Sequence, residues 1–589
     1  MAGVVAQRSK DAKRFVDRHR EGGETRRTGI MSDTPRHLHT FLIGAAVGLG
    51  AGDLLLGLNP ALLGLVRTAR LLGGLGVLGL LVFGLATIWS REKVPGRGGW
   101  LVSGVGAGAF GLFVESQREL NYLFIGNGMR RLLVAASAVS FVLAAVCLAA
   151  IFLRPGLRAA RTVAAAAVLL YGIVPFVGRR APERERLAAS SVLPRASSRG
   201  LLVIGIEGAS WELLTAGASD GSLPAVARLL KEGVAGPLGT LVPYGRDSTW
   251  ISAATGKRPS KHGVVSGRRF DTPLGSLTLL PRFRHGEPLR ALPFSTTVPL
   301  DGEARRSLTF WEILAARGHE GAVLSWPAAA ARDGLVLWAS ERMFATPGEA
   351  VDGRPKETAA GAARFRVGVA GLDPVLVASL EPRGLPSEDR ARAGALPGAA
   401  RDLSVVGAAL AALPAGPGSV SALVLTGMAE PARIYGPSAT PSGYWGATGR
   451  TADLRARALL GYYRLVDRLI GELREREGKD RTICLFAPVG YGPLPVRDAL
   501  VQFAMGREPE AAPDPRHSGF VILTGSGIRA GARLTSANLF DLAPTLLALA
   551  GEPVARDFDG RVLAEAFDER FAESTSIPII VSFEPGGPQ

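Results

Sequence analysis

The chain has 589 residues, of which 47% are hydrophobic, and its mean hydropathy of +0.20 is unusual for a soluble protein and indicates a membrane portion. At about 100–200 residues per domain, this length predicts two to four domains. The net charge of +16 comes mainly from arginines spread along the chain, without a zinc-finger spacing or a basic and aromatic stacking motif, so we expect no nucleic-acid binding. The two cysteines, Cys147 and Cys484, lie in apolar runs and exclude a disulfide framework.

The first 38 residues are predicted to form a mobile, basic cytoplasmic tail. They contain nine Lys/Arg against five Asp/Glu and show no apolar periodicity. Met31 is a second candidate start besides Met1, and a start there would remove most of this tail.

Residues 39–178 are predicted to form a transmembrane region of about five helices. Because a bilayer core requires about 20 apolar residues in a helix, the second and fourth apolar runs match best, while the third and fifth are short. A cleaved signal peptide is not expected, since the apolar block continues far beyond any cleavage site. The runs lie at about 41–58, 71–89, 100–115, 132–153 and 162–177.

Glycines and one carboxylate stand out within these runs. We expect the glycines to let membrane helices pack closely. Asp53 in the first run is either a functional intramembrane carboxylate or a group hydrated near the outer interface, and we favour the second interpretation. The glycines are Gly44, Gly48 and Gly52 in the first run and Gly104, Gly106, Gly108 and Gly111 in the third.

The basic residues of the loops predict that the N-terminus lies inside. The basic tail and the basic residues of the loops around 91–97 and 154–161 would lie on the inner side. The basic residues of the loops around 67–70 and 118–131 would lie on the outer side. Five crossings then place everything after about residue 178 outside the cytoplasm, as in a bacterial inner-membrane protein with a periplasmic domain. If one short run did not span, the domain would lie in the cytoplasm instead.

A charged linker at 179–200 leads into a domain at 201–576, which a short tail at 577–589 follows. Short apolar runs there alternate with helical segments such as Leu223–Glu232, which predicts an α/β domain with a mostly parallel central sheet and helices on both faces. In such a sheet the site lies at the carboxyl ends of the strands. The expected strands are Leu201–Ile206, Ala322–Leu324, Leu335–Trp338, Val375–Ala378, Ala422–Leu425, Ile483–Phe486 and Phe520–Leu523.

Three stretches of the domain carry longer motifs. They are LLVIGIEGASWELL…TWISAATGKRPSKHG at 201–263, YYRLVDRLIGEL…RTICLFAPVGYG at 462–492, and HSGFVILTGSGIRAGARL…DFDGRVL at 517–563. In this order they resemble the type I phosphodiesterase/nucleotide pyrophosphatase domains of the alkaline phosphatase superfamily. The resemblance spans nearly all of 200–565 and implies the alkaline phosphatase-like fold for the domain.

The resemblance implies hydrolysis of phosphate esters with two metal ions, usually zinc, and a Thr or Ser nucleophile. In ungapped register the first metal ligand, normally an Asp, falls on Glu207. The nucleophile falls on Arg246, which has no nucleophilic atom. The hydroxyls of Ser248 and Thr249 lie close by and would take its place only with a short gap in the register.

Most of the other metal ligands that the resemblance implies are replaced. The mid-domain Asp and His fall on Ala429 and Arg433. The later Asp-His pair falls on Pro488 and Val489, and His517 alone is unchanged.

Glu207 and His517 are therefore the remnants of the implied metal site. They either share one weakly bound ion or form a hydrogen-bonded pair, and we favour the pair because a structural zinc site normally takes four protein ligands. We expect no catalytic residue and no cofactor. Zinc or another divalent metal is expected only if the chain is an active enzyme.

The stretch at about 266–400 is rich in Pro, Gly and Arg and is expected to form a cap-like insertion that sets ligand specificity. Within it, FWEILAARGHEGAVLSWPAA at 310–329 again resembles the family. If Arg246 and Arg433 both face the former cleft, they could bind a phosphate-bearing ligand without metals, because guanidinium matches phosphate geometry bidentately. The alternative is that both are solvated surface arginines.

These features favour a membrane-anchored, catalytically inactive phosphodiesterase-like protein. It would bind an envelope glycan, a phospholipid headgroup or a membrane protein partner. The alternative is a divergent metal-dependent phosphodiesterase or phosphoryl transferase acting on cell-envelope lipids or glycans. In a third hypothesis the membrane helices carry the function, with Asp53 as the residue to test.

Overall fold

The computed structural model divides into two compact units, residues 1–122 with 127–181 and residues 123–126 with 182–589. The basic tail, the apolar runs at 41–58, 71–89 and 162–177, and Asp53 lie outside the residues that the structure describes. The described residues are parts of 101–118, then 122–124, 126–153, 200–266, 268–272, 275–277, 296–299, 305–329, 334–344, 353–414, 418–440, 448–478, 481–493, 510–515, 517 and 519–584.

Among its described residues, the first unit contains one helix that is long and apolar enough to cross a bilayer. This helix is α4 (Asn127–Leu153), whose apolar segment Leu133–Leu153 has 21 residues and a mean hydropathy of 2.5. Because about 20 apolar residues span the hydrocarbon core, the length and composition of α4 agree with the fourth expected span. The other expected spans lie wholly or partly outside the described residues.

Glycines of the helical residues in 101–118 allow a close approach to α4. A Cβ added at Gly104 would lie 3.1 Å from Cγ of Leu148, and one at Gly111 would lie 3.0 Å from Cε1 of Phe141. The earlier glycine meets the later residue of α4, so the two segments run antiparallel. The packing agrees with the role expected for the glycines of the third run.

The second unit is built on a nine-stranded sheet. From one edge to the other, its strands are β14 (Ala537–Asn538), β2 (Val234–Gly239), β13 (Gly519–Thr524), β10 (Thr482–Ala487), β1 (Leu201–Ile206), β9 (Val420–Leu425), β6 (Gly321–Leu324), β7 (Leu335–Ala339) and β8 (Gly353–Arg354). The five strands β10, β1, β9, β6 and β7 pair in parallel. The β10–β13, β13–β2 and β7–β8 pairs are antiparallel. The sheet is therefore mostly parallel, as expected.

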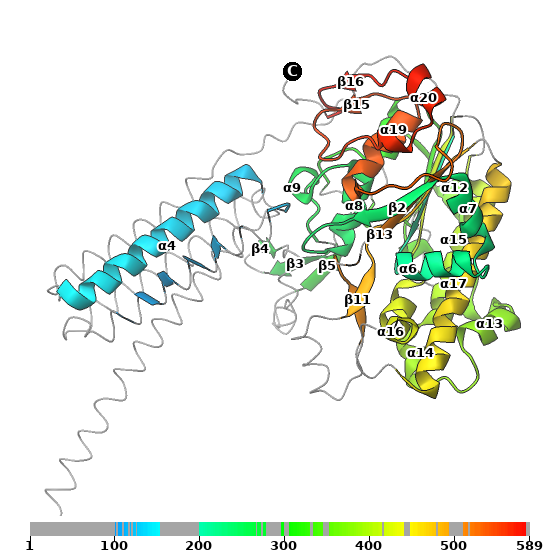
Figure 1. The fold of residues 1–589 in the computed structure, drawn as a ribbon, viewed down its shortest axis with the longest axis horizontal. Coiled ribbons are helices and arrows are strands. Elements are labelled where there is room, and N and C mark those ends of the chain that lie inside the picture. Colours follow the sequence, from blue (N-terminus) through cyan, green and yellow to red (C-terminus); the bar gives the residue numbers. More distant parts are fainter. Residues whose placement is uncertain are drawn as a thin grey trace, which may run out of the picture. The chain divides into compact units, whose positions relative to one another are not determined.

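Helices cover both faces of this sheet (Figure 1). One face carries α6 (Trp211–Ser219), α7 (Pro224–Glu232), α12 (Lys356–Ala363), α13 (Pro374–Leu380), α14 (Ser387–Ala393), α15 (Ala395–Ala412), α16 (Ala429–Ala439) and α17 (Arg450–Glu477). The other face carries α8 (Arg246–Thr255), α11 (Phe310–Ala316) and α19 (Leu542–Leu549).

The central strand shows why both faces need a helical layer. Leu202, Ile204 and Ile206 lie in the hydrophobic cluster of the first face, and Leu201 and Val203 lie in the cluster of the second. Successive side chains of a strand point to opposite faces, so a continuous apolar run requires cover on both. The run of six apolar residues thus specifies a buried central strand.

Smaller elements complete the second unit. Three small sheets consist of β3 (Arg268–Thr272), β4 (Gly275–Leu277) and β5 (Thr296–Pro299); of β11 (Tyr491–Pro493) and β12 (Ala511–Pro513); and of β15 (Val554–Ala555) and β16 (Ile579–Ile580). The short helices are α9 (Pro259–His262) and α20 (Glu569–Ser574), with 3-10 turns at Arg342–Phe344, Val369–Gly371, Leu539–Asp541 and Ala564–Ala566.

One expected strand is wrong, because Val375–Ala378 lies within α13. Asp373 caps this helix, since its carboxylate accepts a hydrogen bond from the backbone N–H of Val375 at 2.7 Å. A proline follows Asp373 in the first turn, where its missing N–H leaves no bond unmade. A four-residue apolar run is compatible with a strand or with a helix, and the cap at Asp373 favours the helix.

The stretch at 266–400 contributes to several parts of the unit rather than to one. Residues 310–339 supply α11, β6 and β7 to the main sheet and its second face. The strands β3, β4 and β5 form a sheet of their own, and α12 to α14 pack on the first face.

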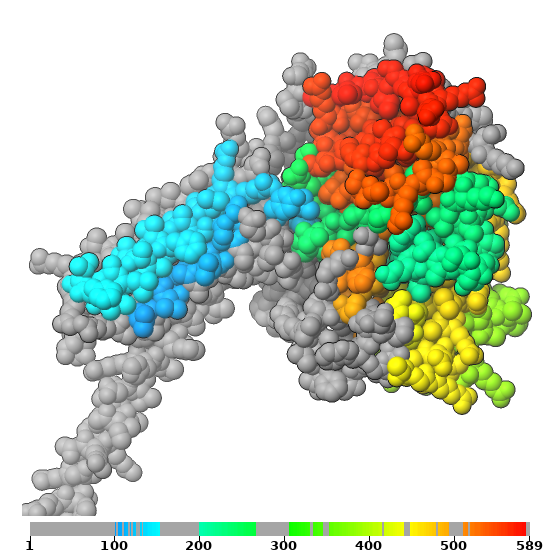
Figure 2. All heavy atoms as spheres, viewed as in Figure 1, coloured from blue at the N-terminus to red at the C-terminus, as the bar shows by residue number. Residues whose placement is uncertain are grey.

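The C-terminal segment, red in Figure 2, lies against the rest of the domain. Its contacts continue as far as Glu584. Its strand β16 pairs in parallel with β15, and the Glu584 carboxylate binds Nζ of Lys257. Asp557 binds the same ammonium group at 2.5 Å, and the Lys257 side chain is only 5% exposed. Part of the expected tail at 577–589 thus helps to hold a buried charge.

The four residues 123–126 belong to the second unit although they precede α4 in the chain. Phe124 is fully buried in the hydrophobic cluster of the second face. The carbonyl oxygen of Leu123 accepts a hydrogen bond from the backbone N–H of Ser260 at 3.1 Å. This short segment is therefore an integral part of the α/β unit.

Candidate functional site

The candidate site lies at the carboxyl ends of β1, β9 and β10, as expected for a mostly parallel sheet. Glu207 directly follows β1, and its backbone N–H donates to the carbonyl of Leu425 at the end of β9 at 2.9 Å. Gly208 has a φ of +95°, and a Cβ there would lie 2.9 Å from Cα of Ala429. The ends of two strands and the start of α16 therefore form one compact wall.

The guanidinium group of Arg246 binds the Glu207 carboxylate through two parallel hydrogen bonds. Nε donates to Oε1 and Nη2 to Oε2, both at 2.7 Å. The side chain of Glu207 is 7% exposed and that of Arg246 is 36% exposed. Bidentate pairing is the strong form of such a contact. It puts a fixed positive charge beside the carboxylate that remains from the implied metal site.

A second carboxylate, that of Glu341, binds the same guanidinium group. Nη2 of Arg246 donates to Oε1 of Glu341 at 2.8 Å and Nη1 donates to Oε2 at 3.1 Å. Burial disfavours the charged guanidinium, but Glu207 and Glu341 outweigh this effect and hold the pKa of Arg246 well above its usual range. Burial raises the pKa of the Glu207 carboxyl, an effect that Arg246 opposes.

The hydroxyls of Ser248 and Thr249 are fully buried in α8 rather than directed into a cleft. Ser248 Oγ donates to the carbonyl of Gly245 at 3.0 Å. The buried Oγ1 of Thr249 has no hydrogen-bond partner among the described residues. Neither group lines the pocket described below, and neither has a base beside it that would activate it as a nucleophile.

The two mid-domain positions lie at the start of α16. Ala429 begins the helix, and Arg433 lies one turn later. Nε of Arg433 donates to the Glu430 carboxylate at 2.9 Å, and Nη1 binds Glu510. Glu510 also binds Arg392, so the guanidinium groups of two arginines share its carboxylate. Arg433 is thus paired with carboxylates, as Arg246 is, and the two arginines have different partners.

Pro488 and Val489 follow β10 and are buried. A Cβ added at Gly519 would lie 2.8 Å from both the carbonyl carbon of Pro488 and the backbone nitrogen of Val489, so the start of β13 packs directly on this turn. Neither side chain offers an oxygen or nitrogen to a metal ion. The turn fills space where the resemblance implies two ligands.

His517 is held by its backbone close to this turn. Its carbonyl oxygen accepts from the N–H of Gly490 at 2.9 Å, and its own N–H donates to the carbonyl of Asp514 at 2.9 Å. The imidazole lies directly against Gly492, where any side chain would clash with the ring. The expected hydrogen bond between His517 and Glu207 is not present among the described residues, where both oxygens of Glu207 bind Arg246 instead.

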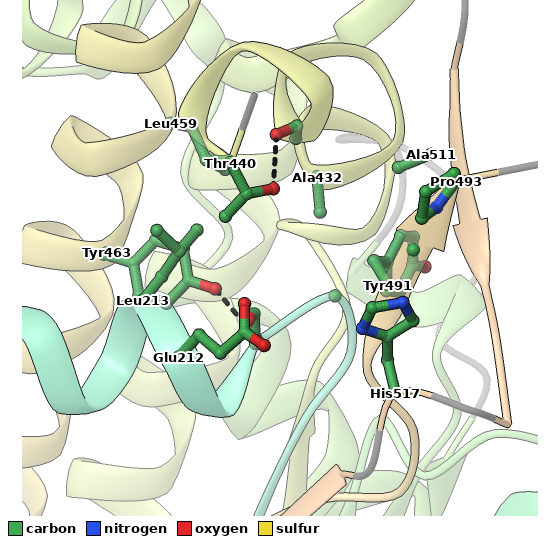
Figure 3. Close-up of a pocket in the computed structure, with 14 residues that line it drawn as sticks. Glu212, Leu213, Ala432, Thr440, Leu459, Tyr463, Tyr491, Pro493, Ala511 and His517 are labelled. Atoms are coloured by element: carbon green, nitrogen blue, oxygen red, sulfur yellow. Dashed lines mark hydrogen bonds between the residues drawn. The ribbon is translucent and has the colours of Figure 1, made fainter. Parts of the chain in front are cut away.

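A pocket of about 130 Å³ opens beside these residues (Figure 3). It lies between α6, α16, α17 and the β11–β12 hairpin, and Gly208, next to Glu207, forms part of its wall. The phenolic oxygen of Tyr463 in α17 accepts a hydrogen bond from the backbone N–H of Ser210 at 2.7 Å. The polar side chains that line the pocket are Ser210, Glu212, Thr440, Tyr463, Tyr491 and His517.

Several of these residues were not expected from the sequence. Glu341 comes two residues after β7, so its position at a strand's carboxyl end was the available signal. Glu212 and Tyr463 lie on helices and carry no motif. Tyr491 stands within the APVGYG motif, two residues after Val489, where the resemblance implies metal ligands and gives a tyrosine no role.

The TGKRPSKHG motif is structural in the described residues. His262 is fully buried, and its Nδ1 accepts from the N–H of Val264 at 3.1 Å while Nε2 lies 2.9 Å from Oγ of Ser252. Burial lowers the pKa of His262 to about 3, so the ring is neutral and Nε2–H donates to the serine. Arg258 binds Asp559 in a region close to the C-terminus.

The metal-donor atoms of the described residues do not fit a two-metal centre. Among the described residues, no three His, Cys, Asp or Glu side chains are grouped so that they could hold a metal ion. The remaining carboxylate, that of Glu207, already binds a guanidinium group, and a positive charge at this place opposes a metal cation. Borderline cations such as zinc require several carboxylate, imidazole or thiolate ligands at fixed spacing.

Residues 201–504 match a family described as type I phosphodiesterase / nucleotide pyrophosphatase. A comparison of the sequence with curated proteins gives no match.

Solved structures that are similar to this chain share little of its sequence. An inactive form of murine ectonucleotide pyrophosphatase / phosphodiesterase 5 in complex with AMP is 12% identical over 63% of this chain and all of its own, with a TM-score of 0.33. A phosphonate monoester hydrolase from Silicibacter pomeroyi is 17% identical over 62% of this chain and 76% of its own, with a TM-score of 0.35. A mutant of the alkaline phosphatase PafA is 12% identical over 64% of this chain and all of its own, with a TM-score of 0.37.

Proposed function

Since the chain belongs to the type I phosphodiesterase / nucleotide pyrophosphatase family, we propose that it is a membrane-anchored, catalytically inactive member that acts by binding. Its ligand would be a component of the cell envelope, a glycan, a phospholipid headgroup or a partner membrane protein. The domain would lie outside the cytoplasm, attached through the helices that precede it.

The pairing of Arg246 with Glu207 carries this proposal. The family resemblance places the nucleophile at Arg246, and a guanidinium group, which stays protonated, cannot attack phosphorus. The same group occupies both oxygens of Glu207, at the first metal position. One substitution therefore removes the nucleophile and supplies a permanent cation where the family would use a metal ion.

The loss at the end of β10 supports the same conclusion. Pro488 and Val489 lie in a stretch that otherwise resembles the family closely, and both are buried in the turn against β13. A carboxylate or imidazole could not be restored there by a small movement of the backbone. The scaffold is kept while the donor atoms are lost, which favours binding over catalysis.

Anchoring in a membrane is supported by the composition of α4. Its segment Leu133–Leu153 contains no charged residue, and its mean hydropathy is 2.5. The close packing of Gly104 and Gly111 on the same helix is typical of membrane helices, in which small residues let backbones approach.

The alternative function, a divergent metal-dependent phosphodiesterase or phosphoryl transferase, has one observation in its favour. The imidazole of His517 has no hydrogen-bond partner among the described residues and faces the pocket. A single imidazole does not replace the missing nucleophile, so we rank this function second.

The test uses the full-length protein in detergent. Zinc content after incubation with zinc and dialysis, and hydrolysis of bis(4-nitrophenyl) phosphate with zinc or manganese, are compared between the wild type and His517→Ala. We expect no stoichiometric metal and no hydrolysis above the detergent blank in either protein. Two bound zinc ions, or metal-dependent hydrolysis that His517→Ala abolishes, would overturn the proposal.

A further inference from the structure

We propose that the pocket between α6, α16, α17 and the β11–β12 hairpin binds an uncharged ligand rich in hydroxyl groups, the chemistry of a single sugar ring. The inference rests on the proposed binding function and names the ligand class. The cavity of about 130 Å³ is smaller than the roughly 300–1,000 Å³ usual for drug-sized ligands. It therefore suits one ring, or the last unit of a longer chain.

The charges on the described residues around the pocket oppose a phosphate group as its ligand. Those that line it include no lysine or arginine, and they do include the carboxylate of Glu212. The nearby guanidinium of Arg246 already binds the carboxylates of Glu207 and Glu341. Among the described residues, an entering phosphate would thus face a negative charge without an unpaired cation in the lining to compensate it.

The hydrogen-bonding groups match hydroxyls, which donate and accept at once. Burial raises the pKa of Tyr463, so its hydroxyl keeps a proton that it can donate, while its oxygen accepts from Ser210. The imidazole of His517 lines the pocket, and neither of its ring nitrogens has a partner among the described residues, so both are available to hydroxyl groups. The Glu212 carboxylate, labelled in Figure 3, adds an acceptor among the side chains that line the pocket.

Apolar groups supply the remaining walls of the pocket. The ring of Tyr491 and the side chains of Leu213, Leu459 and Pro493 line it. A sugar ring has C–H faces as well as hydroxyls, and such faces pack on aromatic and aliphatic side chains.

The experiment measures saturation transfer by NMR to full-length protein in detergent from pairs of probes. Glucose is compared with glucose 6-phosphate, N-acetylglucosamine with its 6-phosphate, and each free sugar with its methyl glycoside. We expect a neutral sugar to bind at least about tenfold more tightly than its phosphate, since one unfavourable charge contact of about 1.4 kcal/mol has this effect. Equal binding of the methyl glycoside indicates a chain terminus, and loss of its binding indicates a free sugar.

Two variants test the assignment to this pocket. Glu212→Gln should bring the affinities for a sugar and its phosphate closer together, and Glu388→Gln, on the exposed first turn of α14, should not. Phosphate binding that is tighter than sugar binding, or no sugar binding at all, would overturn this inference while leaving the inactive-member proposal intact. Metal-dependent hydrolysis would instead overturn the proposed function.

Discussion

Arg246 and Glu207 form a bidentate ion pair, with both hydrogen bonds at 2.7 Å, at the positions where the family resemblance places the nucleophile and the first metal ligand. Glu341 binds the guanidinium as well, so two carboxylates accept hydrogen bonds from one fixed cation, and Asp247 lies 3.7 Å from it. The pair connects the end of β1 with the start of α8. A side chain thus supplies a positive charge beside this carboxylate, where the family resemblance implies a metal ion.

The first prediction concerns the stability that this ion pair provides. Arg246→Ala leaves the Glu207 carboxylate buried without its partner, and we expect the free energy of unfolding of the domain to fall by about 3 kcal/mol, the lower end for a broken buried pair because Arg246 is partly exposed. Chemical unfolding followed by tryptophan fluorescence measures it. As a control, Arg561→Ala removes an ion pair with Glu565 whose side chains are 49% and 40% exposed. It should cost less than about 0.5 kcal/mol.

A double variant separates the lost pair from a general packing defect. Adding Glu207→Gln to Arg246→Ala removes the uncompensated charge, so stability should recover in part. If the double variant were as unstable as the sum of the two single variants, the ion pair would not be the cause.

The second prediction concerns Asp402, a fully buried carboxyl on α15. Its oxygens accept from the N–H of Gly427 and the hydroxyl of Tyr462, each at 3.0 Å. Burial is the largest influence and raises the pKa of Asp402 from 3.8 to about 7. The folded protein therefore binds this proton more tightly than the unfolded chain does. The free energy of unfolding should fall as pH rises from about 4 to about 7 and stay level above that.

The size of this effect follows from the shift. At about 1.4 kcal/mol for each pH unit, the loss attributable to Asp402 is about 4 kcal/mol. Asp402→Asn keeps an acceptor for Gly427 but has no proton to lose, so its stability should depend less on pH over this range. Chemical unfolding at pH 4.5, 6 and 7.5 compares the two proteins, and parallel curves would contradict the prediction.

The third prediction concerns the side of the membrane on which the domain lies. Phe124 is a core residue of the α/β unit, so residues 123–126 must be on the same side of the bilayer as that unit. If α4 crosses the bilayer, the chain has to cross again between Leu153 and Gly200 to reach β1. We expect this shared side to be outside the cytoplasm.

Labelling of cysteines in intact cells measures this sidedness. Gly126→Cys and Gly361→Cys place thiols where a Cβ meets no atom within 4 Å. A membrane-impermeant maleimide should label both from outside, whereas the wild type, in which Cys147 and Cys484 are buried, should not react. Labelling of the two positions from opposite sides would refute the shared location.

Local patterns were sufficient for most of the fold. The six apolar residues of Leu201–Ile206 predict a strand covered on both faces, because period-two alternation with no polar residue leaves no face for water. The run at Val375–Ala378 was too short for such a decision, and the cap at Asp373 made it a helix. Short apolar runs are ambiguous because both elements can bury them.

The side chains at Arg246, Pro488 and Val489, on which the proposed loss of activity rests, can also be read from the sequence, since chemistry depends on which atoms a side chain carries. The partners that these side chains bind could not be predicted from the sequence, because each contact joins residues far apart in the chain. The expected pair of Glu207 with His517 gave way to Arg246, whose guanidinium has donors enough for both oxygens of Glu207.

By itself, the sequence determined six strands of the central sheet, the family and the side chains on which the proposed inactivity rests, because these depend on residue type and local order. Only the tertiary structure decided which charges meet. The contacts of Glu341 with Arg246 and of Glu584 with Lys257 cross 95 and 327 positions of the chain. Coulomb and hydrogen-bond energies depend on distance in space, which folding sets and chain order does not reveal.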